Sequence, residues 1–180
     1  CVVADINQDG QLDVIVSYCG TFFRSTLYVY TLVNGIPVLI AENTIPGFNI
    51  NNGCPSVSDI DNNGIPNILV SKDQAIRNFE YDGSGILKLK WSFPVFDREC
   101  YTGIITFDLD GDKTDEIIYR GDSLLYIIDG SSNSPVLIDT AICWSITLSE
   151  NCIVGDIDNS GESKICTVCG SGRNDNLWGP

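Results

Sequence analysis

The sequence contains no histidine, and it has only 10 lysine and arginine residues against 24 aspartates and glutamates. The missing imidazole excludes nucleophilic catalysis by a serine–histidine or cysteine–histidine pair, and it leaves only thiolate clusters for a zinc site. The formal net charge of −14 argues against a nucleic-acid partner, because neutralising phosphates requires a basic surface. No apolar run is long enough to cross a bilayer, so we expect no membrane span.

Helical periodicity is also missing from the chain. No stretch of ten or more residues keeps a period of about 3.6, and β-branched and aromatic residues dominate the apolar segments. The pattern therefore predicts an all-β fold. The 180 residues, 43% of them hydrophobic, are enough for one ordinary domain or a part of one. Eight cysteines favour an oxidising compartment, so we expect a secreted protein of the extracellular cell surface.

The strongest positive feature is a short acidic segment that recurs at intervals of about 50 residues, a period typical of propeller blades. Apolar segments and hairpin-type Asn-Gly or Asp-Gly pairs follow it in a fixed order, which predicts four strands per unit. The expected blades are residues 1–50, 51–99, 100–148 and an incomplete 149–180. About three and a half blades are then present, of what we expect to be a seven-bladed β-propeller. Closed propellers carry four to eight blades. We therefore expect the remaining blades on further sequence of the same protein or on neighbouring subunits.

The acidic segments have the composition of calcium loops. Calcium takes six to eight oxygen ligands, and a tight loop supplies them from side chains at positions 1, 3, 5 and 9 and a backbone carbonyl at position 7. The expected ligands are Asp5, Asn7, Asp9, Asp13 and the carbonyl of Gln11; Asp59, Asp61, Asn63, Asn67 and the carbonyl of Ile65; Asp108, Asp110, Asp112, Glu116 and the carbonyl of Thr114; and Asp156, Asp158 and Ser160.

The four loops differ in charge, so we expect them to differ in affinity. The first and third carry the most carboxylates, the second closes on Asn67, and the fourth has Lys164 where a carboxylate should stand. We expect the Lys164 ammonium to replace the metal. An EF-hand is excluded because it needs a glutamate at position 12 and a helix on each side, whereas position 12 of the first loop is Val16. The alternative is an Asx-rich turn that holds no metal.

Cysteines flank the first and fourth loops at matching places. Cys1 and Cys152 precede these loops, and Cys19 and Cys169 follow them. If each loop joins an antiparallel hairpin, disulfides Cys1–Cys19 and Cys152–Cys169 are the expected pairs.

Two further patterns suggest recognition. Arg120-Gly121-Asp122-Ser123 spells an integrin-recognition tetrapeptide, but we favour a plain hairpin turn, in which Gly and Asp are the usual residues. The aromatic residues that could line a sugar-binding surface, or belong to the core, are Trp91, Trp144, Tyr28, Tyr81 and Tyr126.

The loops, with the Leu-Tyr-Val-Tyr and Leu-Tyr-Ile-Ile-Asp-Gly segments that follow them, resemble the FG-GAP/VCBS repeats of integrin-like β-propellers, particularly those of secreted adhesin-like proteins of Bacteroidetes. The literal Phe-Gly and Gly-Ala-Pro elements are absent, so integrin ligand binding is not carried over. The resemblance implies structural calcium, extracellular placement and a non-enzymatic role in adhesion or scaffolding, with a protein or surface glycan as partner. A lectin propeller and a propeller polysaccharide lyase are the alternatives.

Overall fold

The computed structural model describes residues 1–19, 24–46, 53–98, 100–144 and 151–170, and every regular element within these ranges is a β-strand. The all-β prediction is confirmed. None of the described residues forms a helix with the length and apolar character needed to cross a bilayer.

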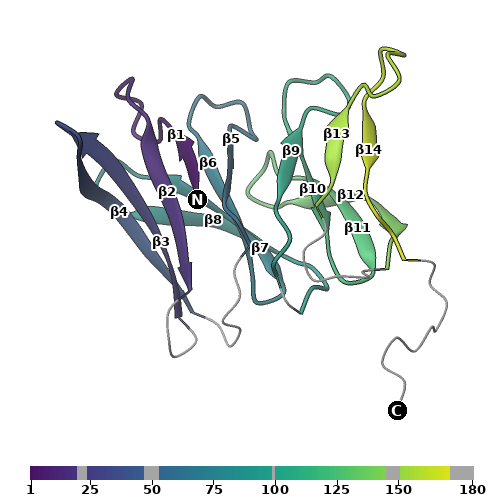
Figure 1. Ribbon diagram of the computed structural model, residues 1–180, viewed down its shortest axis with the longest axis horizontal. Coiled ribbons are helices and arrows are strands. Elements are labelled where there is room, and N and C mark those ends of the chain that lie inside the picture. Colours follow the sequence, from purple (N-terminus) through teal and green to yellow (C-terminus); the bar gives the residue numbers. More distant parts are fainter. Residues whose placement is uncertain (20–23, 47–52, 99, 145–150, 171–180) are drawn as a thin grey trace.

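The strands form antiparallel sheets in which chain order equals spatial order (Figure 1). The first sheet holds β1 (Val2–Ala4), β2 (Asp13–Cys19), β3 (Arg24–Val33) and β4 (Ile36–Pro46). The second holds β5 (Ser56–Ser58), β6 (Asn67–Lys72), β7 (Ala75–Tyr81) and β8 (Leu87–Pro94). The third holds β9 (Ile105–Phe107), β10 (Glu116–Arg120), β11 (Leu124–Asp129) and β12 (Val136–Ile142). The fourth has two strands, β13 (Ile153–Gly155) and β14 (Lys164–Cys166).

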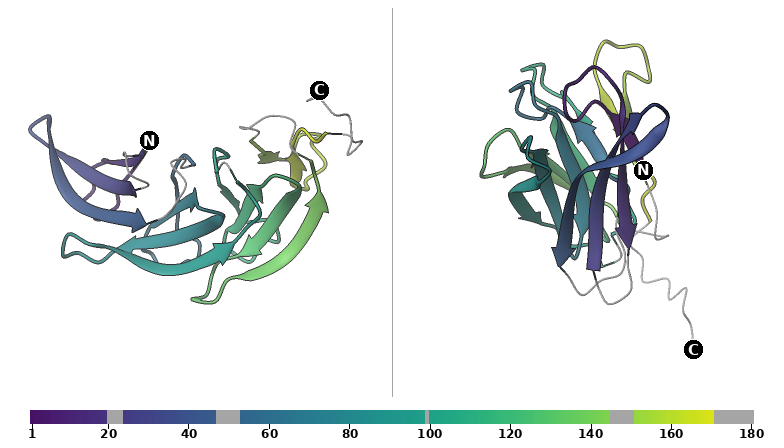
Figure 2. Two further views of the ribbon diagram at one scale, coloured as in Figure 1. Left: turned by 90° about the horizontal axis from the view of Figure 1, so that it is seen from below. Right: turned by 90° about the vertical axis from the view of Figure 1, so that its left-hand side faces the viewer.

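The sheets follow one another along an arc, with the first sheet at one end and β13 and β14 at the other (Figure 2). The three four-stranded sheets also share an irregularity between their third and fourth strands, at Val29/Tyr30, Asn78/Phe79 and Ile127/Ile128. A bulge of this kind bends a strand and increases its twist. The outer strands are therefore shaped in the same way in all three sheets.

The core lies between neighbouring sheets rather than within any one of them. Side chains alternate along a strand, so each inner strand can contact the sheet before it and the sheet after it. On β6, Ile68 packs with the first sheet and Leu69 with the third, and both are 0% exposed. Each fully buried side chain of this size contributes about 1.5–3 kcal/mol. The sheets therefore stabilise one another, and the acidic loops are held at one edge of the stack.

Both predicted disulfides are wrong. Cys169 is bonded to Cys143, and Cys1 and Cys152 are free thiols. Strand register explains the first error: Val2 pairs with Ile15, so the position opposite Cys1 is Val16. Cys19 lies three residues farther along, or about 10 Å at 3.3 Å per residue, which exceeds the span of a disulfide.

The second error has a similar origin. Ile153 pairs with Cys166, which places Cys152 opposite Thr167 rather than Cys169. The amide of Gly170 donates a hydrogen bond of 2.8 Å to the carbonyl of Trp144. This contact joins the segment after β14 to the segment after β12, and it brings Cys143 and Cys169 together with their Cα atoms 4.8 Å apart.

Candidate metal centre

The four acidic loops share one backbone conformation. Each joins the first strand of its sheet to the second, and all four lie along the same edge of the arc (Figure 1). Each has a positive φ at its fourth and sixth positions, namely Gln8 (59°) and Gly10 (84°), Asn62 (51°) and Gly64 (86°), Gly111 (82°) and Lys113 (78°), and Asn159 (56°) and Gly161 (84°). The left-handed region costs a residue with a Cβ about 1–2 kcal/mol. Lys113 therefore adopts the left-handed conformation at the sixth position at a free-energy cost that the glycines at this position of the other three loops avoid.

The first aspartate of each loop holds the turn closed by accepting backbone N–H groups. Asp5 accepts from Asp9 at 3.1 Å and from Gly10 at 2.9 Å. Asp59 and Asp156 make the same pair of bonds in their own loops. In the third loop one donor differs: Asp108 accepts from Gly111 at the fourth position rather than from the fifth residue, and from Lys113 at the sixth position as in the other loops. The local sequence thus fixes the loop through Asx turns.

The closing side chain lies beneath three of the loops. Asp13, Asn67 and Glu116 accept the N–H of the second loop residue at 3.0, 3.0 and 2.7 Å. These side chains are 0%, 0% and 4% exposed. An acidic or amide oxygen is therefore buried under each of these loops, where water cannot fully solvate it.

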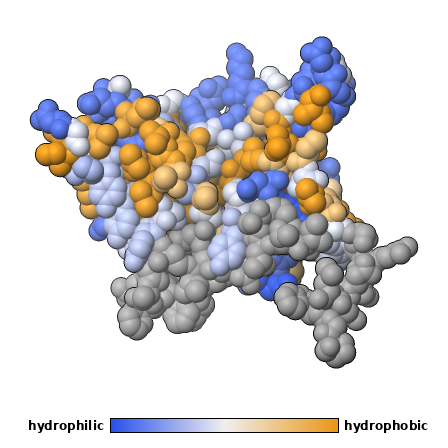
Figure 3. Space-filling model, in the orientation of Figure 1, coloured by the Kyte–Doolittle hydropathy of each residue, from blue (hydrophilic) through white to orange (hydrophobic). Residues whose placement is uncertain are grey.

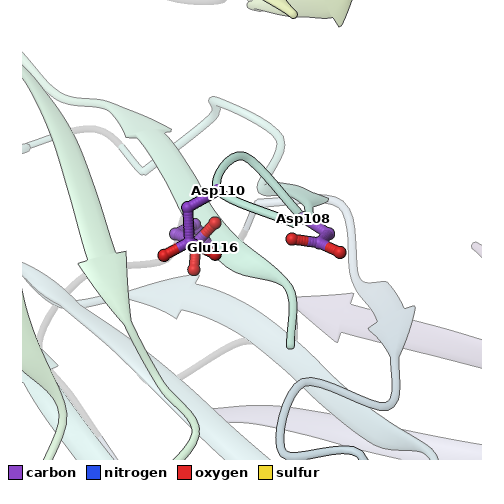
Figure 4. A group of neighbouring side chains, drawn as sticks. All are labelled: Asp108, Asp110 and Glu116. Atoms are coloured by element: carbon purple, nitrogen blue, oxygen red, sulfur yellow. The ribbon is translucent and has the colours of Figure 1, made fainter. Parts of the chain in front are cut away.

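The third loop brings three carboxylates together. One oxygen from each of Asp108, Asp110 and Glu116 lies within 4.8 Å of the others (Figure 4). Burial raises the pKa of Glu116, and the negative charges of Asp110, Asp112 and Asp108 raise it further. Asp112 is held by Thr114, whose amide and hydroxyl both donate to it. Such a cluster could bind a metal ion, because a cation would relieve the repulsion among these carboxylates.

The first loop holds a buried oxygen atom that makes no hydrogen bond among the described residues. Asp13 uses Oδ2 to accept from Ile6 and Asn7, while its buried Oδ1 has no hydrogen-bond partner among the described residues. An unpartnered buried polar atom is costly. The oxygens of Asp5, Asn7 and Asp9 belong to the same loop, so the donor set is the all-oxygen kind that hard cations prefer.

Glu80, a residue that the sequence analysis missed, contacts the closing residue of the second loop. Asn67 donates its amide to Glu80 on β7 at 3.1 Å, and Glu80 accepts from Lys90 at 2.7 Å. Burial raises the pKa of Asp61, and the charge of Glu80 raises it further, so the two carboxylates act on each other. Glu80 stands opposite Asn67 in the strand register. The signal available in the sequence was a carboxylate within the predicted strand, which also carries Arg77 and Asn78.

The fourth loop holds a cation of its own. The ammonium of Lys164 donates to the hydroxyl of Ser160 at 3.0 Å, and it lies 3.8 Å from Asp158 and 3.2 Å from Glu162. The position that closes the other loops with an oxygen therefore carries a positive charge here.

Arg120, Gly121 and Asp122 of the recognition tetrapeptide are in close contact with other segments of the chain. The Arg120 side chain is 1% exposed and donates to the carbonyl of Trp144 at 2.8 Å. Asp122 forms an ion pair of 2.6 Å with Arg98. A Cβ on Gly121 would stand 2.4 Å from the carbonyl of Phe96. The arginine is thus unavailable to an integrin-type receptor, and the turn reading is correct.

The aromatic residues do not form a common surface. Trp91 and Tyr126 are each 6% exposed and belong to the core between the second and third sheets, and Tyr81 packs against the core between the first and second. Tyr28 packs near Tyr30 on the first sheet, and Trp144 is 49% exposed near the other end of the arc.

Comparison with known proteins gives no family assignment. The chain matches no protein-family model and no curated protein. Among solved structures, it is similar to a chain of the Tc holotoxin pore of Photorhabdus luminescens, with 14% sequence identity and a TM-score of 0.42. That match covers 91% of this chain and 10% of the toxin chain.

Proposed function

We propose that this chain is a calcium-stabilised segment of an extracellular β-propeller that serves in adhesion or as a structural scaffold. The observation that carries the metal assignment is the convergence of Asp108, Asp110 and the buried Glu116 within 4.8 Å. The unpartnered Oδ1 of Asp13 supports a second site in the first loop.

The chemistry of the donors favours calcium over transition metals. Every candidate ligand is a carboxylate, amide, hydroxyl or carbonyl oxygen, and such ligands suit hard cations. Calcium accepts irregular sets of six to eight oxygens, whereas magnesium demands an octahedron. We assign calcium chiefly to the first and third loops and more weakly to the second, where Asn67 replaces a carboxylate. Lys164 takes the place of the metal in the fourth loop.

The role assigned to the metal is structural. Each loop connects two paired strands, and its carboxylates also bind backbone N–H groups, so a bound ion would tie a hairpin together. A ligand that binds only the folded state adds RT ln(1 + [L]/Kd), which is about 2.7 kcal/mol at a hundredfold excess over Kd. An enzymatic role would need a convergent acid and base outside the loops, and the chain has no histidine.

The propeller assignment is supported by the arrangement of the sheets. Three sheets have the same strand order and the same bulge, and they stack along an arc through apolar faces. Extracellular fluid supplies calcium at the concentration that weaker sites require, and an oxidising compartment allows the Cys143–Cys169 disulfide. A role in adhesion follows from the resemblance to FG-GAP/VCBS repeats.

Differential scanning fluorimetry tests the metal assignment. We expect EDTA to lower the melting temperature, calcium to restore it and magnesium to restore it less. Substituting both Asp9→Ala and Asp112→Ala should remove most of the response to calcium. An identical melting curve with and without EDTA would refute the assignment. A glycan array then separates a scaffold from a lectin. If the chain is a lectin, the labelled protein should bind to particular sugars on the array, and if it is a scaffold it should bind to none.

A further inference from the structure

We propose that Glu80 orients the side-chain amide of Asn67, so that the amide oxygen and not the nitrogen is presented to a cation in the second loop. Glu80 is thus a positioning residue, because it acts on the closing side chain and not on the cation itself. The inference rests on the proposed calcium sites, and it makes the second site depend on a residue of β7, outside the loop.

The second loop differs from the first and third in the chemistry of its closing side chain. Asp13 and Glu116 end in two oxygens, so either orientation presents an oxygen to the loop. Asn67 ends in one oxygen and one NH2 group, and the NH2 group is a donor that cannot bind a cation. The second site therefore requires that the amide of Asn67 be held in one of its two orientations.

Two neighbours hold the Asn67 amide in the required orientation. Its Oδ1 accepts the N–H of Ile60 at 3.0 Å, and its Nδ2 donates to Oε1 of Glu80 at 3.1 Å. A backbone N–H can only donate and a carboxylate can only accept, so reversing the amide would break both hydrogen bonds. The amide oxygen has two lone pairs, so it can accept from Ile60 and also bind a cation.

The contact between Asn67 and Glu80 lies where water cannot replace it. Asn67 is 0% exposed and Glu80 is 9% exposed, whereas the acidic loops form hydrophilic projections at the top of the space-filling view (Figure 3). A buried amide that loses its partner leaves a polar group unpaired, which is costly. Burial therefore strengthens the preference of Asn67 for the orientation that Glu80 sets.

Lys90 on β8 fixes Glu80 in turn. Its ammonium donates to Oε2 of Glu80 at 2.7 Å, which leaves Oε1 to accept from Asn67. The ammonium also offsets the negative charge of Glu80, so the effect of Glu80 on the second site is chiefly geometric. A chain of contacts thus runs from β8 through β7 to the closing residue on β6.

The first and third sheets carry other residues at the position of Glu80. In the first sheet the strand register places Thr31 opposite Asp13. In the third sheet Asp129 stands opposite Glu116, and its carboxylate accepts the N–H of Ser131 at 2.8 Å. Among the three four-stranded sheets described, a glutamate therefore stands opposite the closing residue where that residue is an asparagine.

Nuclear magnetic resonance of the isotopically labelled whole chain tests this role, because glycine amides report each loop separately. Gly10, Gly64 and Gly111 belong to the first, second and third loops, so their shifts during a calcium titration give one dissociation constant for each loop. Glu80→Gln should weaken calcium binding in the second loop by about tenfold or more and leave the other two constants unchanged.

The reason is that glutamine has one oxygen for two donors. The ammonium of Lys90 is the charged and therefore stronger donor, so the glutamine NH2 group is left facing Asn67 and reverses its amide.

Asn67→Asp separates the orientation of the amide from the charge of Glu80. An aspartate presents an oxygen in either orientation, so adding Glu80→Gln to Asn67→Asp should change the affinity of the second loop by less than about threefold. If Glu80 acted through its charge alone, Glu80→Gln would weaken binding by the same factor with or without Asn67→Asp. Asp139→Asn on the exposed β12 removes one charge elsewhere, and it should leave all three constants unchanged.

The unmodified chain in EDTA gives a second test that needs no variant. Nuclear Overhauser effects should place the amide protons of Asn67 beside Glu80, and amide protons beside the N–H of Ile60 instead would overturn the proposal.

The titration overturns the proposal if Glu80→Gln leaves the second loop unchanged, or if it weakens binding equally with and without Asn67→Asp. If Gly64 does not respond to calcium while Gly10 and Gly111 do, the proposal fails and the calcium assignment of the first and third loops stands. If none of the three glycines responds, the calcium assignment fails together with the proposal.

Discussion

The substitution Glu116→Gln should change stability in opposite directions with and without calcium. Glutamine keeps an oxygen that can accept the N–H of Leu109, which Glu116 binds at 2.7 Å, but it removes the charge. Glu116 is 4% exposed, and its carboxylate lies within 4.8 Å of Asp108 and Asp110.

The size of the effect follows from Coulomb's law. Two unit charges 4.8 Å apart repel by about 3.5 kcal/mol at an effective dielectric constant of 20 and by about 0.9 kcal/mol at 80. Because Asp110 is exposed to solvent, the net repulsion should lie near the lower value. Without calcium, Glu116→Gln should therefore stabilise the fold by about 1 kcal/mol, which raises the melting temperature by about 2–4 °C for a chain of this size.

With calcium the same substitution removes a charged ligand. The gain of about 2.7 kcal/mol expected at a hundredfold excess over Kd should then largely disappear for this site. Scanning calorimetry in EDTA and in calcium measures both effects, and Asp139→Asn on the exposed β12 controls for the change in net charge. The reasoning fails if Glu116→Gln lowers stability in EDTA, or if it keeps the full calcium response.

Other perturbations address the fourth loop, a buried thiol and the contact between sheets. Lys164→Asp should create a calcium site in the fourth loop, because it replaces the ammonium near Ser160 with a carboxylate; isothermal titration calorimetry should show an added site, and an unchanged stoichiometry would contradict this. Burial raises the pKa of Cys100 to about 11, so about one thiol in a thousand is ionised at pH 8. Iodoacetamide should then label the exposed Cys54 and spare Cys100 in peptide mass spectra; equal labelling rates would be inconsistent with this burial. Gly130→Ala should cost about 1–3 kcal/mol, because the new methyl group would stand 2.9 Å from Trp91 and 2.8 Å from Ile117; an unchanged urea midpoint would show that the sheets can separate freely there.

The loops and the strand order could be predicted from the sequence because both are local. Alternate oxygen-bearing residues with a glycine at the sixth position specify the turn through contacts a few residues apart, as the bonds from Asp9 and Gly10 to Asp5 illustrate. Hairpin pairs and alternating apolar residues likewise specify antiparallel neighbours. The confirmed all-β fold rests on these short-range signals.

Features that depend on register or on contacts between distant segments could not be predicted in this way. The pairing of Cys143 with Cys169 depends on a contact between the segments that follow β12 and β14. Glu80 joins the second loop only because β7 places it opposite Asn67. Arg120 is likewise buried where its side chain reaches the carbonyl of Trp144, and this contact between distant segments cannot be read from the Arg-Gly-Asp-Ser motif.

The most direct test of the central claim is the anomalous diffraction of a crystal grown in calcium. We predict anomalous density in the first loop beside Asp13 and in the third loop beside Glu116, with oxygen ligands at about 2.3–2.6 Å. The fourth loop should show no such density, since the Lys164 ammonium lies beside Ser160 and Asp158 and would repel a cation there. Water alone in the first and third loops at saturating calcium would contradict the account.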